Sequence, residues 1–456
     1  MSPAHGRERA TAPTVGAICD VLLRPTDPIR VRARPMRRLL VSFALLLAAA
    51  AIGAAARADE VCADALGCVE IGPDDKIVIA GLLRFSGPEP WTGNVAVSAF
   101  QLATLARGGA LLGREIELVL EDSACSEEVA REAALRIAAD PAVVGVIGTN
   151  CSLAAKGALP VLSEAGLLMI SPSNSSPFLT NADPDAGGLY RPGYFRTAHN
   201  DLFQGALSAR FAASVLGVET IATIDDGDPY TRGLAGAMAD TFVSLGGAVV
   251  LRGQINRGDT DMSAVLNAVA EAGAELVYFP VFANEGHRIV KQLAETPGLE
   301  DTIMMSADGA FTRSFAQDAG EAGIGLYVAG PQVSGAAYDA YVDAWRREID
   351  ESGPSGGFHA HGYDAANLLF AALEAVAVER EDGALIIGRA ALRDAMSAVE
   401  DFPGLTGSLS CQEESPHAGD CATGEALAIF QLSAAEVHDG DWPPPVVWTA
   451  SMAASG

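Results

Sequence analysis

Apolar and polar positions along the chain fall into two alternating patterns. Short runs that are apolar at nearly every position indicate buried strands, and longer runs with apolar residues three or four apart indicate amphipathic helices. The first part of the chain gives strands at Lys76–Leu83, Glu115–Glu121, Val143–Ile147 and Leu167–Ile170, and helices at Val95–Ala106, Ser126–Ala139 and Leu153–Glu164. Apolar strands that alternate with helices predict a parallel sheet covered on both faces.

A loop rich in Gly, Pro and Asp, Asn181–Pro192, separates this set from a second alternating set. The second set comprises helices at Asp201–Leu216, Tyr230–Leu245, Met262–Ala272 and Glu285–Glu295, and strands at Thr220–Ile224, Ala248–Arg252, Leu276–Phe279, Thr302–Met305 and Gly325–Ala329. Residues 336–351 and 360–378 form two further helices without strands of their own, so we expect them to cover the first sheet. The tail is strand-like at Gly404–Ser410 and Ala426–Leu432.

The predicted fold is therefore α/β, with two doubly wound parallel-sheet lobes. We expect residues 74–196 and 331–402 in the first lobe, and residues 197–330 and 403–456 in the second. This division makes the chain cross between the lobes more than once. Several crossings form a hinge, and a hinge between two lobes creates a cleft that can close on a ligand.

The N-terminal residues 1–58 have the pattern of an export signal. Met36-Arg37-Arg38 precedes the uncharged run Leu39–Ala56, which ends in Ala56-Arg57-Ala58. A charged start, an apolar stretch and small residues at the cleavage point are typical of a secretory signal peptide. We therefore expect translation to start at Met36, cleavage before Asp59 and a periplasmic mature protein. The alternative is a transmembrane anchor.

The chain is strongly acidic, with a formal net charge of −28 and only three lysines. The predicted leader holds nine arginines and three acidic residues, so its removal leaves the remainder more acidic still. Such a field repels nucleic acid and anionic lipid head groups. A nucleic-acid partner is therefore not expected.

Six cysteines follow the predicted leader, and an even number in an exported chain favours disulfides. Proximity along the sequence favours the pairs Cys62 with Cys68, Cys125 with Cys151, and Cys411 with Cys421. The alternative is metal binding, but no C-x-x-C motif or adjacent His supports it.

Two clusters of small hydroxyl residues each follow an apolar strand, at Thr149–Ser152 and Ser171–Ser176. Ligands of open α/β sheets bind just past the carboxyl ends of parallel strands. A hydroxyl-rich turn beside a free helix N-terminus is suited to a small anion such as a carboxylate. We therefore expect the chain to hold a small polar molecule.

From about Lys76 to Leu432, the chain resembles the type I periplasmic binding proteins, in the leucine/isoleucine/valine-binding branch of ABC-transporter receptors. The resemblance rests on E-D-x-x-C at Glu121–Cys125, G-T-x-C-S at Gly148–Ser152, L-M-I-S-P at Leu168–Pro172 and G-Y-D-A at Gly362–Ala365. It implies the Cys125–Cys151 disulfide, a binding protein without cofactor or covalent chemistry, and delivery of the ligand to the membrane subunits of an ABC permease.

The resemblance also implies roles for residues in both lobes. Ser152, next to Cys151, would hold the α-carboxylate of an amino acid, with Ser173 and Ser175 completing that end. Asp308 would pair with the ammonium, in place of the Glu of leucine-binding members, through a strong and directional contact. On the sequence alone, Ser152 is placed to cap the following helix, and the other three residues could be turn formers.

Three aromatic residues match the cleft walls of the same family: Trp91, Tyr230 and Phe282. Aromatic walls with few polar groups are normal for small-ligand sites, although each residue could be ordinary packing. Trp91 stands where a Tyr is frequent. The expected ligand is an apolar or aromatic amino acid or a related carboxylate, and the alternative is an amide, urea or an aromatic acid.

Two competing classes of protein remain. An enzyme would need a catalytic motif, and the chain lacks G-x-S-x-G, H-E-x-x-H, G-x-x-x-x-G-K-[ST] and G-x-G-x-x-G. His359 and His361 could be metal ligands but are expected to begin a helix near the hinge, and Asp225–Asp228 suggests a calcium loop but is expected to be a turn at the cleft rim. A binding protein that presents its ligand to a separate sensor is the second alternative.

Overall fold

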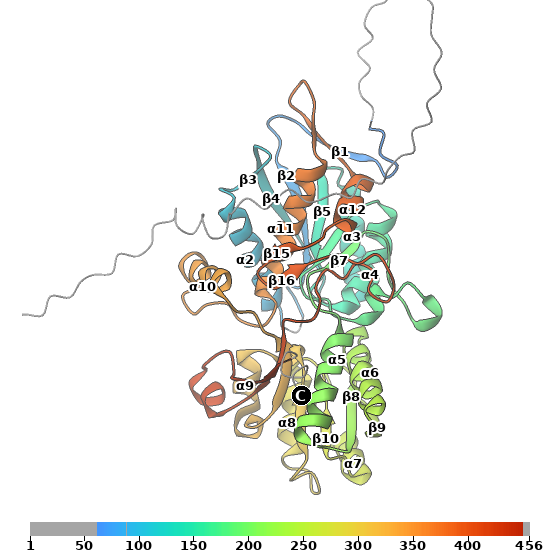
Figure 1. Cartoon of the computed structure of the whole chain (residues 1–456), viewed down its shortest axis with the longest axis vertical. Helices are drawn as coiled ribbons and strands as arrows, with labels where there is room; N and C mark the ends of the chain where they lie inside the picture. The colour runs from blue at the N-terminus through green and yellow to red at the C-terminus, as the bar shows by residue number, and fades with distance from the viewer. Residues whose placement is uncertain (1–61, 88, 450–456) are drawn as a thin grey trace, which may run out of the picture.

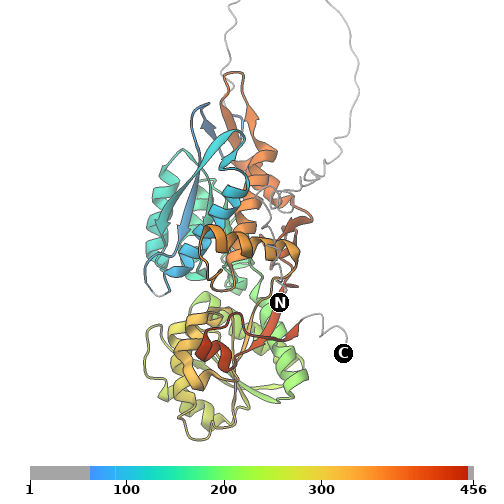
Figure 2. The ribbon, with the colours of Figure 1, turned by 90° about the vertical axis from the view of Figure 1, so that its left-hand side faces the viewer.

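The computed structural model describes residues 62–87 and 89–449. The predicted signal peptide and its cleavage point lie outside these residues. The described chain forms two α/β lobes, one above the other in Figure 1, and Figure 2 shows the same division from the side. Both lobes have the predicted architecture, a largely parallel sheet with helices on each face. None of the described helices is long and apolar enough to cross a membrane.

The first lobe is built on a six-stranded sheet with the order β3-β4-β2-β5-β6-β7. Its strands are β2 (Ile77–Leu83), β3 (Ala110–Leu111), β4 (Arg114–Asp122), β5 (Val143–Gly148), β6 (Met169–Ser171) and β7 (Tyr194–Arg196). Its covering helices are α2 (Trp91–Ala106), α11 (His359–Val376), α3 (Glu127–Ala139) and α4 (Ser152–Glu164). On β2, Ile79 packs in the core under α2 and α11, whereas Ala80 packs in the core under α3 and α4. Burial on both faces explains why the central strands β2 and β5 are apolar throughout.

The second lobe has a seven-stranded sheet with the order β18-β17-β12-β11-β10-β8-β9. Its strands are β8 (Thr220–Asp225), β9 (Ala248–Gln254), β10 (Leu276–Tyr278), β11 (Ile303–Ser306), β12 (Tyr327–Pro331), β17 (Leu427–Gln431) and β18 (Val446–Thr449). Its helices are α5 (Asp201–Arg210), α6 (Pro229–Ser244), α7 (Ser263–Ala272), α8 (Ala283–Leu293) and α9 (Arg313–Ala319). On β10, Val277 faces α7, α8 and α9, and Tyr278 faces α5 and α6. The last two strands, β17 and β18, join the sheet antiparallel.

The two helices without strands of their own cover the first sheet, as predicted. They are α10 (Ala336–Glu348) and α11, and both contribute to the core of the first lobe. The predicted helix Asp201–Leu216 is α5 followed by a π-helical turn over Phe211–Leu216.

The pattern did not predict β3, β7, β18 or α9 in the two lobes. It also missed four elements outside the central sheets: β1 (Cys68–Ile71), β14 (Leu385–Gly388), β13 (Val378–Glu379) and α12 (Arg389–Ser397). The three strands form a small separate sheet in which β14 lies between β1 and β13. Because β1 pairs with a strand more than three hundred residues away, nothing in its local sequence marks the pairing.

The predicted lobe boundary in the tail is wrong. The prediction placed residues 403–456 in the second lobe, but Leu409, Cys411 and Cys421 pack in the core of the first. This segment includes a hairpin of β15 (Phe402–Gly404) and β16 (Gly407–Leu409), where the sequence suggested one strand. The chain returns to the second lobe only at β17.

The chain crosses between the lobes at three places within the described residues: after β7, after β12 and before β17. A buried ion pair, Arg196 to Asp420 at 2.5 Å, ties the first and third crossings together. Asn200 donates to the same carboxylate at 2.8 Å. The predicted multi-crossing hinge is therefore present.

All three predicted disulfides are present: Cys62–Cys68, Cys125–Cys151 and Cys411–Cys421. The second joins the loop after β4 to the residue that precedes α4, and so fixes one wall of the space between the lobes.

Candidate functional site

A cavity of about 720 Å³, including its open mouth, lies between the lobes. All eight residues predicted for the ligand site line it: Trp91, Cys151, Ser152, Ser173, Ser175, Tyr230, Phe282 and Asp308. They come from both lobes, and the longest sequence separation among them exceeds two hundred residues. Their roles toward a ligand remain predictions, but the fold brings all of them to one place.

The first lobe contributes the two hydroxyl clusters, which a hydrogen-bond network holds side by side. The Ser171 hydroxyl donates to the carbonyl of Thr149 at 2.7 Å, and the Thr149 hydroxyl donates to the carbonyl of Cys151 at 2.9 Å. The side-chain amide of Asn174 donates to Thr149 Oγ1 at 3.0 Å. The Ser173 hydroxyl donates to the carbonyl of Asn150 at 3.3 Å. These bonds set the ends of β5 and β6 against each other.

Ser152 is the first residue of α4, not its cap. Cys151 holds the cap position and makes no side-chain capping bond. The first amides of α4 therefore have no intrahelical acceptor and none from the side chain of the cap residue, and the Ser152 hydroxyl is not occupied in capping. An uncapped helix N-terminus beside a serine hydroxyl is suited to a carboxylate.

The second lobe contributes Asp308, which lies directly after β11. The Tyr230 hydroxyl donates to Asp308 Oδ1 at 3.2 Å and accepts from the Gly309 amide at 2.9 Å. Burial raises the pKa of Asp308 to about 6. Tyr230 itself lies at the start of α6, and its backbone amide donates to Asp228 Oδ1 at 2.9 Å. The carboxylate is thus fixed in position and poised to gain from a cationic partner.

Aromatic side chains form much of the remaining wall. The rings of Tyr230 and Phe282 lie 5.3 Å apart. Gly356 packs on the indole of Trp91, where its φ of 78° and a distance of 3.0 Å from an added Cβ to the ring disfavour a larger residue. The sequence did not single out Phe311 or Phe358, which also line the cavity.

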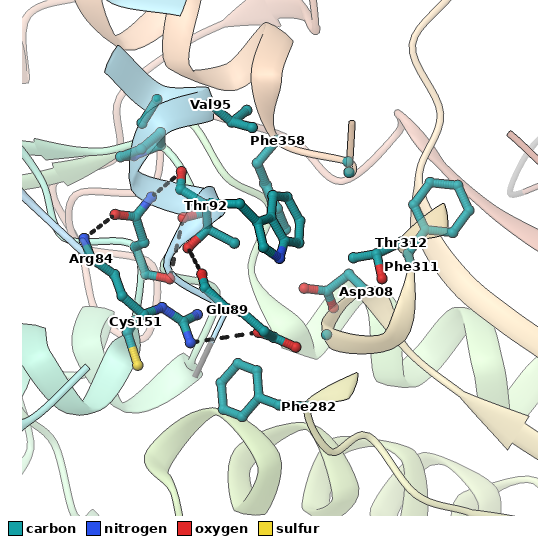
Figure 3. Close-up of a pocket in the computed structure, with 18 of the residues that line it drawn as sticks. Arg84, Glu89, Thr92, Val95, Cys151, Phe282, Asp308, Phe311, Thr312 and Phe358 are labelled. Carbon is teal, nitrogen blue, oxygen red and sulfur yellow. Dashed lines mark hydrogen bonds and ion pairs between the residues drawn. The ribbon is translucent and has the colours of Figure 1, made fainter. Parts of the chain in front are cut away.

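A charged cluster was also missed from the sequence: Arg84 and Glu89 line the cavity, and Arg257 lies behind them on the ring of Phe282. Glu89 lies in the first lobe and pairs with Arg84 at 3.5 Å, and it accepts from the amide of Ala283 in the second lobe at 3.0 Å. Figure 3 shows Glu89 between Arg84 and Phe282, with Asp308 and Thr312 across the cavity. Burial raises the pKa of Glu89 and lowers that of Arg84. No motif marks these residues, and the contacts of Glu89 with Ala283 and of Arg257 with Cys125 exist only where the lobes meet.

Arg257 contributes to the cluster from the second lobe. It pairs with Asp228 at 2.5 Å and donates to the carbonyl of Cys125 in the first lobe at 3.3 Å. The guanidinium groups of Arg84 and Arg257 lie 5.5 and 5.1 Å from the ring centre of Phe282. One arginine from each lobe therefore packs on this ring.

The residues considered as alternative metal ligands, His359, His361 and Asp225–Asp228, have other roles in the structure. His359 begins α11 and contacts the Tyr338 hydroxyl at 3.0 Å and the carbonyl of Gly356 at 2.9 Å, and His361 follows two residues later in the same helix. Neither belongs to a group of three potential ligands among the described residues. Asp225–Asp228 forms a turn in which Asp228 caps α6.

Comparison with known proteins adds a family to this geometry. Residues 76–434 match the family described as periplasmic binding protein. An amino acid binding protein of Pseudomonas aeruginosa is 32% identical over 255 residues, which are 56% of this chain and 65% of that protein. The Leu/Ile/Val-binding protein of Escherichia coli is 29% identical over 310 residues, covering 66% of this chain and 80% of that protein.

Solved structures show the same fold. A leucine binding protein from Thermotoga maritima has a TM-score of 0.69 at 23% identity, covering 82% of this chain and 99% of that chain. A solute binding protein of an ABC transporter from R. palustris, in complex with benzoate, has a TM-score of 0.67 at 20% identity, covering 82% of this chain and 96% of that one.

Proposed function

The chain belongs to the periplasmic binding protein family, and from this premise we propose that it is the substrate-binding component of an ABC transporter that captures an amino acid between its lobes. The observation that carries the proposal is the pairing of opposite chemistries in one cavity. The first lobe offers an uncapped helix end with serine hydroxyls, and the second offers the buried carboxylate of Asp308. This arrangement is complementary to a zwitterion.

In this proposal, the α-carboxylate binds Ser152 and the first amides of α4, with Ser173 and Ser175 beside it. The α-ammonium binds Asp308, whose position the Tyr230 hydroxyl fixes at 3.2 Å. Trp91 and Phe282 contact the rest of the ligand. Curated relatives named for amino acids support this ligand class, since the P. aeruginosa relative is an amino acid binding protein.

Closure follows from the same contacts. A ligand that touches Ser152 in one lobe and Asp308 in the other gains its full set of interactions only when the lobes meet, so it shifts the population toward the closed form. The closed form would then dock on the membrane subunits of the permease. Export to the periplasm through the N-terminal segment is part of the same proposal.

Thermal melting with a panel of small molecules tests the proposal directly. The protein is first unfolded and refolded to remove any co-purified ligand, then melted with each amino acid, with small amides and urea, and with aromatic carboxylates. A ligand at about 100 times its dissociation constant adds about 2.7 kcal/mol of stability. Shifts confined to amino acids would support the proposal. Shifts with aromatic carboxylates alone would instead indicate a binding protein for aromatic acids.

A further inference from the structure

A second carboxylate lies behind the cavity, next to Asp308. Asp201 is the first residue of α5 and is fully buried, with 0% of its surface exposed. The ligand atoms of Asp201, Asp308 and His199 all lie within 4.8 Å of one another. Neither carboxylate oxygen of Asp201 accepts a hydrogen bond of good geometry from a described residue. A buried carboxylate in this state is costly unless a cation or a proton compensates it.

Among the described residues, the charged groups around Asp201 do not supply that cation. Arg196 on β7 is committed to Asp420 at 2.5 Å and to the carbonyls of Asn174 and Ser176 at 3.1 and 2.8 Å. His199 is buried, and its Nε2 contacts Gln204 Oε1 at 2.6 Å. The remaining titratable neighbours are neutral or acidic: Tyr230 on α6, Tyr278 on β10, and Asp308 and Asp420.

The two carboxylates influence each other's protonation. Burial, and then the charge of Asp308, raise the pKa of Asp201 well above its usual value, and the nearby hydroxyl of Ser175 opposes that rise. Burial raises the pKa of Asp308 to about 6. Two buried carboxylates this close cannot both be ionised without cost, so the empty pair favours holding a proton between them.

We propose that Asp201 and Asp308 form a dicarboxylate end of the site that binds a protonated amine, and that the arriving amine displaces the proton held by the pair. The inference rests on the proposed function and deepens it, because it defines the ligand as a cation at this end. Asp308 lines the cavity and touches the amine, whereas Asp201 lies behind it and acts through Asp308 as a positioning residue. Ser175 connects the two layers, since its carbonyl accepts from the Asp201 amide at 2.9 Å.

A divalent metal is the competing occupant of this cluster. The geometry favours the amine, because His199 already contacts Gln204 and its ring stacks on Phe358 at 5.9 Å. Asp308 likewise already accepts from Tyr230. A zinc site needs three or four ligands turned toward one point, which these commitments do not provide.

Titration calorimetry on the full protein tests the proposal without any variant. The probe is the amino acid that gives the largest melting shift, measured near neutral pH in two buffers with different ionisation enthalpies. We expect release of up to one proton per ligand bound, and affinity that weakens as the pH falls below about 6, because protons then compete for Asp308. The 2-hydroxy analogue of the same amino acid, which lacks the ammonium, should release no proton.

The Asp201→Asn variant locates the proton. We expect it to bind the amino acid at least about tenfold more weakly at mildly alkaline pH, to release no proton, and to bind the 2-hydroxy analogue as the wild type does. Asp240→Asn, on the exposed side of α6, serves as the matched control with unchanged binding and proton release.

Three results would overturn the inference. Amino-acid binding by the wild type without proton release refutes it, and so does proton release that persists in Asp201→Asn. Saturable binding of Zn²⁺ alone that is lost in this variant would assign the cluster to a metal. A protein that binds no amino acid at all would instead count against the proposed function, so the two failures are distinguishable.

Discussion

Asp308 is half-buried at the end of β11 and is held by the hydroxyl of Tyr230 at 3.2 Å. Replacing it with Ala removes the charged partner of the ammonium and leaves the carboxylate end of the ligand untouched. We expect Asp308→Ala to weaken amino-acid binding by roughly 10- to 100-fold, since a charge-assisted hydrogen bond contributes about 1.5–3 kcal/mol. Calorimetry with an amino acid and its 2-hydroxy analogue measures the difference.

The control for this variant is Asp301→Ala, which alters an exposed residue just before the same strand. It should leave both ligands bound as in the wild type. Equal losses for the amino acid and the hydroxy acid in Asp308→Ala would refute the assigned role, because they would show a general disruption of the cavity.

Single residues also show which parts of the site could be predicted from the sequence and which could not. The eight cavity residues were predictable because they follow strand ends or belong to motifs shared with a family. Asp201 was not, since an acidic residue in the first turn of a helix is common on surface helices as well. Its buried position beside Asp308 depends on how the first crossing places α5, which no local pattern specifies.

At the scale of elements, α8 has an N-terminus that is completed from the other lobe. Its cap residue, Phe282, offers no side-chain acceptor, and the Ala283 amide instead donates to Glu89 at 3.0 Å. Because Glu89 lies in the first lobe, this bond forms only when the lobes are close. The hydrogen bond between Glu89 and Ala283 thus links closure of the lobes to the N-terminus of α8.

We expect Glu89→Gln to bind its ligand about tenfold more weakly, through faster dissociation, because the variant loses the charged contacts to Arg84 and to the end of α8. Stopped-flow dissociation measures the effect. The matched control is Glu115→Gln, whose pairing with Lys76 at 3.1 Å is exposed and is expected to contribute little. An unchanged dissociation rate in Glu89→Gln would contradict a role in holding the lobes together.

Elements were predictable to the extent that their burial is regular. Central strands such as β5 and β10 are buried at every position, so their apolar runs were recognisable and the helices followed between them. The small sheet of β1, β13 and β14 was missed, because its strands are two to four residues long and β1 pairs with a strand more than three hundred residues away. The tail was misassigned for a related reason: its strand pattern reveals a strand but not which lobe it joins.

At the scale of the whole molecule, the crossings gather three buried histidines at the hinge. His199 lies in the first crossing, and His359 and His361 begin α11 after the second. Phe358 links them, with ring contacts of 5.9 Å to His199 and 5.1 Å to His361. Burial lowers the pKa of His199 and of His359 to about 4, and it lowers the pKa of His361 well below its usual value. The folded hinge therefore favours the neutral form of these three histidines.

This preference gives a pH dependence with a definite sign. The unfolded chain takes up protons at these histidines near pH 6.5, whereas folded His199 resists until about pH 4, so its contribution to stability falls as the pH drops through that window. Buried carboxyls such as Asp364, whose pKa is raised to about 6, work in the opposite direction, but they are common to wild type and variant.

The stability difference between the wild type and His199→Gln therefore isolates the histidine. We expect the variant to be less stable at neutral pH, because it loses the contact to Gln204 at 2.6 Å. Between pH 6.5 and 4 the difference should shrink or reverse, by at most about 3 kcal/mol, since only the wild type must bury a group that its unfolded state protonates. Denaturant melts across this range measure it, with His438→Gln, half-exposed beside Glu321, as the control that should track the wild type. A difference that stays constant with pH would show that His199 stabilises the hinge by packing alone, and that the three crossings carry no proton-sensitive group at this position.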